Sequence, residues 1–154
     1  MELETKTLPA MRFAALGHSG AYMLIGPTFH KFAGIAGPSG LFALPGAMMA
    51  GLYKDDPSNT PQDQLRSAAA VRIPEDAAIP EGLVEERVVG GRFACFTHVG
   101  SYEQLGNSWM LLKRELIPAG GYVLRDATSY EFYLNDPGQV PESELKTEIC
   151  VPIE

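Results

Sequence analysis

The second half of this chain repeats the first half at a constant offset of 80 residues, without a gap. Aligning residues 12–74 with residues 92–154 gives 63 pairs, of which 18 are identical, whereas ordinary residue usage would give about four. A repeat of this length indicates two similar supersecondary units. It therefore predicts an internally duplicated domain, in which the positions that differ between the halves are candidates for function.

The length and charge narrow the class of protein. A chain of 154 residues is long enough for one domain with a substantial core, and we expect residues 1–154 to form a single domain of two repeats, about 1–74 and 82–154. The net charge of −7 disfavours non-specific binding to nucleic acid or to an anionic membrane and suits a cationic ligand. The first residues are acidic rather than basic, and no apolar run is long enough to span a bilayer, so we expect a cytoplasmic protein.

The hydropathy pattern predicts the same elements in each half. In the first half, strands are expected at 2–8, 11–18, 47–53 and 67–73, and a helix at 26–36. In the second half, strands are expected at 83–89, 92–98, 130–135 and 146–153, and a helix at 102–117. Gly90-Gly91 predicts a two-residue hairpin between the first two strands of the second half. Each half is a strand–helix–strand–strand unit after its leading strand, which predicts an α+β fold with an antiparallel sheet and two main helices.

The largest chemical difference between the halves is at Glu131, whose partner in the repeat is Gly51. In a strand, Tyr130 and Phe132 share one face while Glu131 and Tyr133 share the other. Both faces carry bulky side chains, so we expect Glu131 to be at least partly enclosed and its pKa to be raised. A bound cation would relieve the cost of this buried carboxylate, and so would a water molecule that it deprotonates.

A structural explanation of Glu131 stays open. The carboxylate could be half exposed, or it could pair with an arginine such as Arg12, Arg92 or Arg125. These two explanations require no ligand.

Other candidate ligand contacts come from matched positions of the repeat. Tyr53 and Tyr133 could line a ligand site or pack in the core, and Phe29 and Trp109 could bound the site from the two helices or simply pack on the sheet. Indole suits cations, which favours Trp109. Gly51 leaves space, and the neighbouring Met48, with Met49, could form a pliable wall or ordinary core.

The remaining polar residues indicate structural roles. His18 and His98 recur in both halves at the turn between a strand and a helix, so a metal site is not expected. Cys95 and Cys150 lie in predicted strands without metal-type spacing, and we interpret them as buried reduced thiols, with a disulfide as the alternative. Motifs for phosphate, dinucleotide or serine-hydrolase chemistry are absent, and no cofactor is expected. The repeat uses residues 12–154, which leaves no segment for a helix-turn-helix, so direct nucleic-acid binding is not expected.

Several motifs together resemble one family. The pattern His-x-Gly-x-Tyr begins at His18 and again at His98, and the segment Tyr130-Glu131-Phe132-Tyr133-Leu134-Asn135-Asp136-Pro137 is the most specific part of the likeness. The whole chain resembles the GyrI-like small-molecule-binding domain, a family that includes the DNA gyrase inhibitory protein and effector-binding domains of AraC-type regulators. The resemblance implies a pseudo-twofold fold and a groove between the halves, in which a strand glutamate meets aromatic, often cationic molecules. Some relatives are hydrolases of cyclopropane-bearing compounds.

We therefore expect a stand-alone GyrI-like domain that binds a hydrophobic, aromatic or cationic small molecule in a central groove. Glu131 is the key charged residue of this prediction. The predicted ligand contacts are Glu131, Tyr133, Tyr53, Gly51, Trp109, Phe29 and Met48. One alternative is a hydrolase of cyclopropane-type electrophiles, with Glu131 as general base assisted by Tyr133; another is an inhibitor that binds DNA gyrase.

Overall fold

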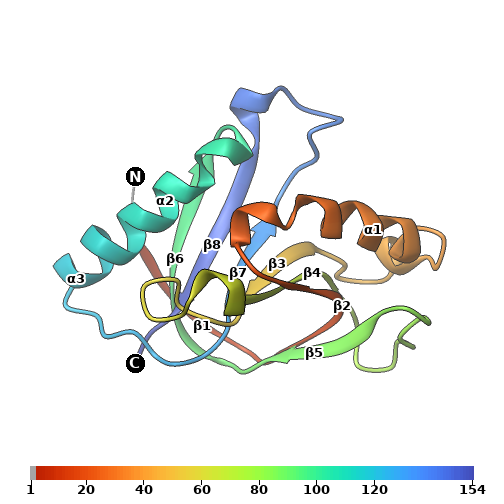
Figure 1. Cartoon of the computed structure of the whole chain (residues 1–154), viewed down its shortest axis with the longest axis horizontal. Coiled ribbons are helices and arrows are strands. Elements are labelled where there is room, and N and C mark those ends of the chain that lie inside the picture. The colour runs from red at the N-terminus through yellow and green to blue at the C-terminus, as the bar shows by residue number, and fades with distance from the viewer. Residues whose placement is uncertain (1–2) are drawn as a thin grey trace. The chain divides into compact units, whose positions relative to one another are not determined.

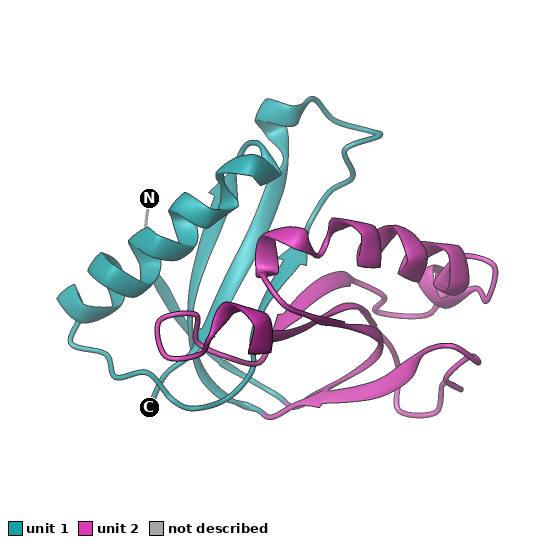
Figure 2. Ribbon diagram, viewed as in Figure 1, with its two compact units in different colours: residues 1–9, 90–154 teal, residues 10–89 magenta. Residues whose placement is uncertain are grey.

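The computed structural model describes residues 3–154, which form eight strands and two main helical segments within two compact units. Figure 1 shows the elements and Figure 2 the units. The strands are β1 (Glu4–Leu8), β2 (Met11–Ser19), β3 (Met49–Tyr53), β4 (Arg66–Arg72), β5 (Val84–Val88), β6 (Gly91–Val99), β7 (Ser129–Tyr133) and β8 (Lys146–Pro152). The helices are α1 (Gly26–Ala36), α2 (Leu105–Leu111) and α3 (Ile117–Ala119).

Unit 2, Ala10–Val89, contains α1 and four antiparallel strands in the order β3-β4-β2-β5. The helix packs on one face of this sheet, where Phe32 and Ala36 are fully buried with Ala14, Ala69 and Val71. Pro27 occupies the first turn of α1, where its missing N–H is no loss. The predicted helix at 26–36 is confirmed.

Unit 1 comprises the described part of Met1–Pro9 together with Gly90–Glu154. Its four strands are antiparallel in the order β1-β6-β8-β7. Leu112 and Ile117, from the helical segment, are buried with Ala94, Ile149 and Val151 on one face of the sheet. Both units therefore have the α+β construction that the sequence predicts, with the helix on one face of an antiparallel sheet.

The predicted helix at 102–117 is one continuous helical segment with changing geometry. It begins as a 3-10 turn at Tyr102–Gln104, continues as α2, widens to a π-helical turn at Leu112–Leu116 and ends as α3. The matching helix α1 has no π turn. A π turn inside a helix commonly accompanies a functional site, and this one follows directly after α2, which carries Trp109.

The predicted hairpin across Gly90-Gly91 is wrong. Strand β5 pairs with β2, and strand β6 pairs with β1. The glycines serve a different purpose: Gly91 has a φ of 140°, and a Cβ there would lie 2.8 Å from the Nη2 atom of Arg125. The positive φ and the close approach of the guanidinium explain why residue 91 is a glycine. The Gly90-Gly91 pair is therefore not a sign of a hairpin between β5 and β6.

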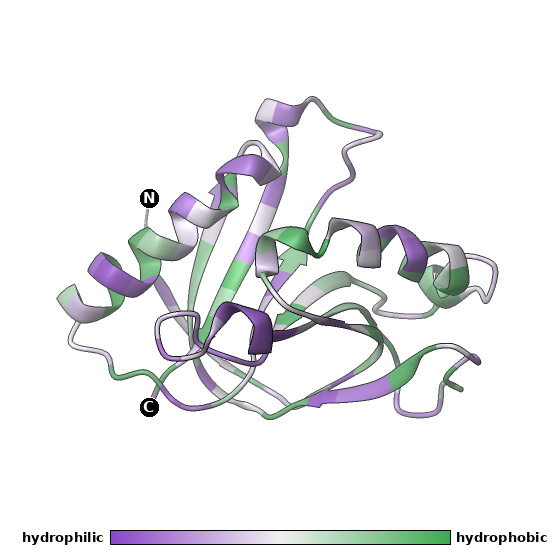
Figure 3. Ribbon diagram, in the orientation of Figure 1, coloured by the Kyte–Doolittle hydropathy of each residue, from purple (hydrophilic) through white to green (hydrophobic). Residues whose placement is uncertain are grey.

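The outer strands β1 and β5 carry charged side chains. Residues 85–87 in the middle of β5 are hydrophilic (Figure 3), and Glu4 and Lys6 lie on β1. Charged side chains on an outer strand discourage pairing with another chain. Residue 2 of the predicted first strand lies outside the described residues.

Each unit contains the same backbone hydrogen bond at positions that match in the repeat. The amide of Gly20 donates to the carbonyl of Leu65 at 2.8 Å, and the amide of Gly100 donates to the carbonyl of Leu145 at 2.8 Å. Both glycines have a positive φ, 110° and 125°, which favours glycine at the turn. These matched turns agree with a repeated unit; superposition of the halves stays a prediction.

Candidate functional site

Glu131 lies in the middle of β7, and its side chain is almost fully enclosed. The residue is 3% exposed. One carboxylate oxygen accepts a hydrogen bond from Trp109 Nε1 at 3.0 Å, and the other accepts one from Tyr133 Oη at 2.9 Å. The predicted enclosure of Glu131 is confirmed, and Trp109 and Tyr133 both donate to its carboxylate.

The local structure explains how these three side chains meet. Alternation along β7 places Glu131 and Tyr133 on one face and Tyr130 and Phe132 on the other, and the rings of Tyr130 and Phe132 lie 5.0 Å apart. Trp109 comes from α2, which packs on the face that carries Ile149, the register partner of Glu131. The predicted faces of β7 are therefore confirmed.

Tyr102 extends the aromatic surroundings of Glu131. Its ring packs edge-on against Tyr133, with 5.5 Å between centroids and 62° between planes. Burial raises the pKa of the Tyr102 phenol, and the nearby charges of Asp136 and Glu131 raise it further. Sequence reasoning did not select Tyr102 as a site residue, although the motif that begins at His98 contains it.

The indole of Trp109 already accepts a cation at its face. Lys113 Nζ lies 5.7 Å from the ring centroid, which is within the range of a cation–π contact. Glu131, Trp109, Tyr133 and Tyr102 thus combine a desolvated negative charge with aromatic rings. This combination is suited to organic cations, because both the charge and the ring faces attract them.

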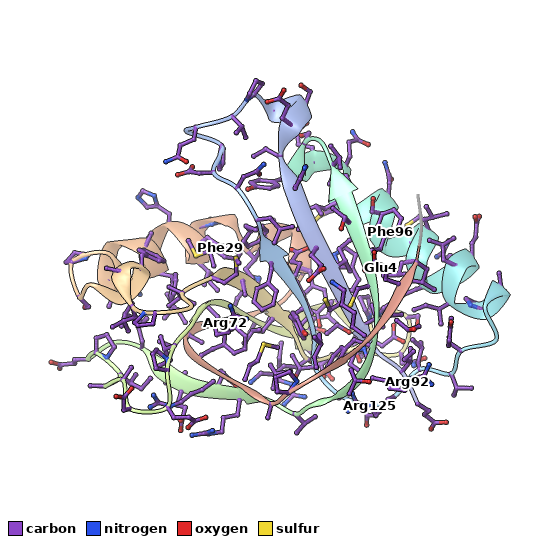
Figure 4. The ribbon with its side chains drawn as sticks, turned by 180° about the vertical axis from the view of Figure 1, so that it is seen from behind. Glu4, Phe29, Arg72, Arg92, Phe96 and Arg125 are labelled. Carbon is purple, nitrogen blue, oxygen red and sulfur yellow. The ribbon has the colours of Figure 1, made fainter. Side chains whose placement is uncertain are left out.

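The three arginines considered as partners of Glu131 make other contacts. Arg12 binds Glu85 and the carbonyls of Pro74 and Ala77. Arg92 and Arg125 lie beside one another (Figure 4) and donate to the carbonyls of Glu154 and Ile153, respectively. The half-exposed alternative for Glu131 is wrong.

The other four predicted contacts belong to unit 2. Tyr53 packs edge-on against Tyr22 at 4.9 Å, as Tyr133 does against Tyr102. Phe29 lies on α1 (Figure 4) and packs against the core of unit 2. Gly51 is buried on β3, and Met48 is half-buried just before it, its carbonyl accepting from the amide of Arg72 at 3.0 Å.

These positions make the difference between the units explicit. Where unit 1 has the carboxylate of Glu131 and the indole of Trp109, unit 2 has Gly51 and Phe29 at the offset of 80. Neither substitute has a polar side-chain atom. The carboxylate with its two donors is therefore a feature of unit 1.

The histidines have the structural role that the repeat predicts. His98 Nε2 lies 2.9 Å from the carbonyl of Ser101, and its Nδ1 lies 2.7 Å from Ser108 Oγ. A carbonyl can only accept, so Nε2 donates to Ser101. His18 repeats the arrangement with Ala21 and Thr28 at 3.1 and 3.3 Å.

Both cysteines are buried, as the sequence predicts, and both are free thiols in this structure. They face each other across β6 and β8, with the two Sγ atoms 3.2 Å apart. Within residues 3–154, no group of three or more His, Cys, Asp or Glu side chains is arranged to hold a metal ion. No helix in this part of the chain is long and apolar enough to cross a membrane.

Comparisons with known proteins give similar sequences and similar folds. The family model described as "GyrI-like small molecule binding domain" matches residues 1–154. DNA gyrase inhibitor 2 of Dickeya dadantii (strain 3937) is 40% identical over 96 residues, which cover 60% of this chain and 60% of that relative's own length.

Two solved structures have the same fold. The structure of SAV2435 bound to tetraphenylphosphonium has a TM-score of 0.70 at 15% identity and covers 100% of this chain and 94% of that chain. The structure of a hydrolase encoded by lin2189 from Listeria innocua has a TM-score of 0.63 at 14% identity and covers 99% of this chain and 92% of that chain. At these identities the likeness shows the fold alone.

Proposed function

We propose that this chain, which belongs to the family of GyrI-like small-molecule-binding domains, binds an aromatic or lipophilic organic cation, with Glu131 as the residue that recognises its charge. The observation that carries the proposal is the carboxylate of Glu131, 3% exposed and held by Trp109 and Tyr133. A carboxylate in such a place is costly to bury. A cation beside it offsets that cost.

The aromatic side chains supply the second half of the recognition. Trp109, Tyr133 and Tyr102 offer ring surface next to the charge, and a lipophilic cation gains from both dispersion and cation–π contacts. The ligand of SAV2435, tetraphenylphosphonium, has this chemistry and supports the choice of ligand class. Tyr53, Gly51, Phe29 and Met48 are retained as proposed ligand contacts.

Titration with tetraphenylphosphonium tests the proposal. We expect a micromolar dissociation constant, roughly −8 kcal/mol, and we expect Glu131→Gln to weaken binding by about 1–3 kcal/mol, or five- to 150-fold. Glu144→Gln, at an exposed residue of the 3-10 turn Glu142–Glu144, removes the same charge away from the site and should leave the affinity unchanged. Equal affinities for wild type and Glu131→Gln would remove Glu131 from the site.

Hydrolysis of a strained-ring electrophile is the second candidate function. The contact between Tyr133 Oη and Glu131 and the fold shared with a hydrolase favour it. In this reaction Glu131 takes a proton from water as the water oxygen attacks a ring carbon, and a C–C bond of the ring breaks. The carbon that keeps the bonding electrons then takes the proton from the Glu131 carboxylic acid, and Tyr133 orients the water or the substrate. Mass spectrometry of a cyclopropane-bearing electrophile should then show ring-opened product, formed about 10²–10⁴ times more slowly with Glu131→Gln. Product formed at the wild-type rate by that variant would exclude this mechanism.

Inhibition of DNA gyrase is the third candidate, supported by the relative from Dickeya dadantii. It requires a protein-binding surface rather than the carboxylate. A supercoiling assay with wild type and Glu131→Gln distinguishes it, because gyrase inhibition of equal strength by both proteins would separate this function from the small-molecule site.

A further inference from the structure

Cys95 and Cys150 form a pair whose backbone placement is suited to a disulfide. The amide of Gly100 donates to the carbonyl of Leu145, and the amide of Ile153 donates to the carbonyl of Arg92. Hydrogen-bonded pairs alternate with non-hydrogen-bonded pairs along an antiparallel ladder. Counting from these two hydrogen-bonded pairs, the Cys95–Cys150 pair is a non-hydrogen-bonded pair. Such pairs have Cα atoms about 4.5 Å apart, within the roughly 4.4–6.8 Å that a disulfide spans.

The two thiols lie on the sheet face opposite the helical segment of unit 1. Their neighbours along the strands, Ala94 and Ile149, pack with Leu112 under the helix, and alternation turns the cysteines the other way. The Sγ atoms are 3.2 Å apart, so only a small movement separates two thiols from a bonded pair.

A cavity of about 310 Å³ is lined in part by one of the two cysteines. Its lining residues are Glu4, Cys95, Thr97 and Glu148, and Glu4 marks the β1 side of this region in Figure 4. This space corresponds to roughly ten water molecules at liquid density, enough for a small organic molecule. Cys95 lines the cavity and Cys150 does not, which makes the two thiols unequal.

A lysine bridges two of the carboxylates that line the cavity. Lys6 Nζ lies 2.7 Å from Glu148 Oε2 and 3.8 Å from Glu4 Oε2. The hydrogen bond to Glu148 raises the pKa of Lys6, and electrostatic attraction to Cys95 contributes in the same direction. The ammonium is held between Glu148 and Glu4, two of the residues that line the cavity together with Cys95.

Cys150 is placed to react second. The contact with the Cys95 thiol and burial raise the pKa of the Cys150 thiol, which disfavours its thiolate. Its Sγ lies 3.7 Å from Glu148 Oε1, so a carboxylate is available to receive its proton.

We propose that Cys95 and Cys150 are a redox-active dithiol that reduces a small hydroperoxide in this cavity and closes to a disulfide between β6 and β8. In the first step Cys95 Sγ attacks an oxygen of the hydroperoxide; an S–O bond forms, the O–O bond breaks, and the thiol proton completes the departing alcohol. This leaves a sulfenic acid on Cys95. In the second step Cys150 Sγ attacks Cys95 Sγ, Glu148 transfers the Cys150 proton to the departing hydroxide, and water leaves. The two thiols lose two electrons in total and the hydroperoxide gains them.

Treatment of the wild-type protein with an equimolar amount of cumene hydroperoxide tests the proposal. After alkylation and digestion, mass spectrometry should find one peptide pair joined through Cys95 and Cys150, with the loss of two hydrogen atoms. Samples quenched early with dimedone should carry the label on Cys95 and not on Cys150. Labelling of Cys150 first, a disulfide between two molecules, or a persistent dithiol would each overturn the proposal.

Variants separate the two steps. Cys150→Ser should stop at the dimedone-reactive sulfenic acid of Cys95, whereas Cys95→Ser should leave Cys150 as a thiol. Glu148→Gln should form sulfenic acid but close the disulfide about tenfold more slowly or worse, and Glu144→Gln is the matched control, expected to close at the wild-type rate. Closure at the wild-type rate in Glu148→Gln would overturn the role of Glu148. Early labelling in the wild type decides the order of reaction even if a serine variant fails to fold.

Discussion

Glu131→Gln should weaken cation binding but leave the stability of the fold equal or raise it. The amide is nearly the same size as the carboxylate. Its oxygen can accept from Trp109 Nε1, and its NH₂ can donate to Tyr133 Oη, because a hydroxyl both donates and accepts. Both contacts, at 3.0 and 2.9 Å, can thus be kept while the buried charge is removed. We expect the free energy of unfolding to stay equal or to rise by up to about 2 kcal/mol.

The variant Tyr133→Phe measures how much the charge of Glu131 contributes to its hydrogen bond with Tyr133. That variant keeps the charge of Glu131 and removes the hydroxyl that donates to it, and a hydrogen bond to a charged group contributes about 1.5–3 kcal/mol. In the Glu131→Gln background the same change removes a neutral bond of about 0.5–1.5 kcal/mol. A double-mutant cycle of these two substitutions should therefore show a coupling free energy of about 1 kcal/mol between residues 131 and 133.

Urea denaturation gives the free energy of unfolding of the wild type, the two single variants and the double variant. A change of about 2 kcal/mol moves the urea midpoint by roughly 1 M. Titration of the same samples with tetraphenylphosphonium gives the affinities. Loss of more than about 2 kcal/mol of stability in Glu131→Gln, with unchanged cation affinity, would show that the carboxylate has a structural role and would refute the reasoning.

Three further predictions use other parts of the molecule. Tyr102→Ala should weaken tetraphenylphosphonium binding by about 1–2 kcal/mol through loss of ring surface, measured by calorimetry, and an unchanged affinity would place Tyr102 outside the site. The side-chain hydrogen bond from Arg66 holds the pKa of Asp55 below its usual value. This pair therefore stabilises the fold above the unfolded pKa of about 4, and the stabilisation is lost as pH falls through the folded pKa. Asp55→Asn should make the urea midpoint less sensitive to acid, and an acid dependence identical to that of the wild type would contradict this. Gly100→Ala should destabilise by about 1–2 kcal/mol because its φ is 125°, whereas Gly106→Ala, in α2 with open space for a Cβ, should stabilise by up to about 1 kcal/mol. Thermal unfolding that ranks the two variants the other way would refute the backbone argument.

The carboxylate site shows how far sequence reasoning can reach. The repeat singled out Glu131 against Gly51, and the alternation along the strand placed Glu131 and Tyr133 on one face, as the structure confirms. Tyr102 was present in a recognised motif but was not selected. Its contact with Tyr133 joins the start of a helical segment to the end of a strand, and such a contact has no signature in local spacing.

Local patterns in the sequence determined the secondary structure, the faces of β7 and the structural role of the histidines, because backbone conformation and side-chain alternation depend on near neighbours. Tertiary structure decided which elements meet. Strand β5 pairs with β2 and not with the following strand β6, although Gly90-Gly91 is a hairpin signal. Gly91 instead leaves room for the guanidinium of Arg125. Trp109 reaches Glu131 and Cys95 reaches Cys150 across 22 and 55 residues of chain. Contacts over such distances depend on strand order and register, which are set by packing of the whole unit and not by any short segment.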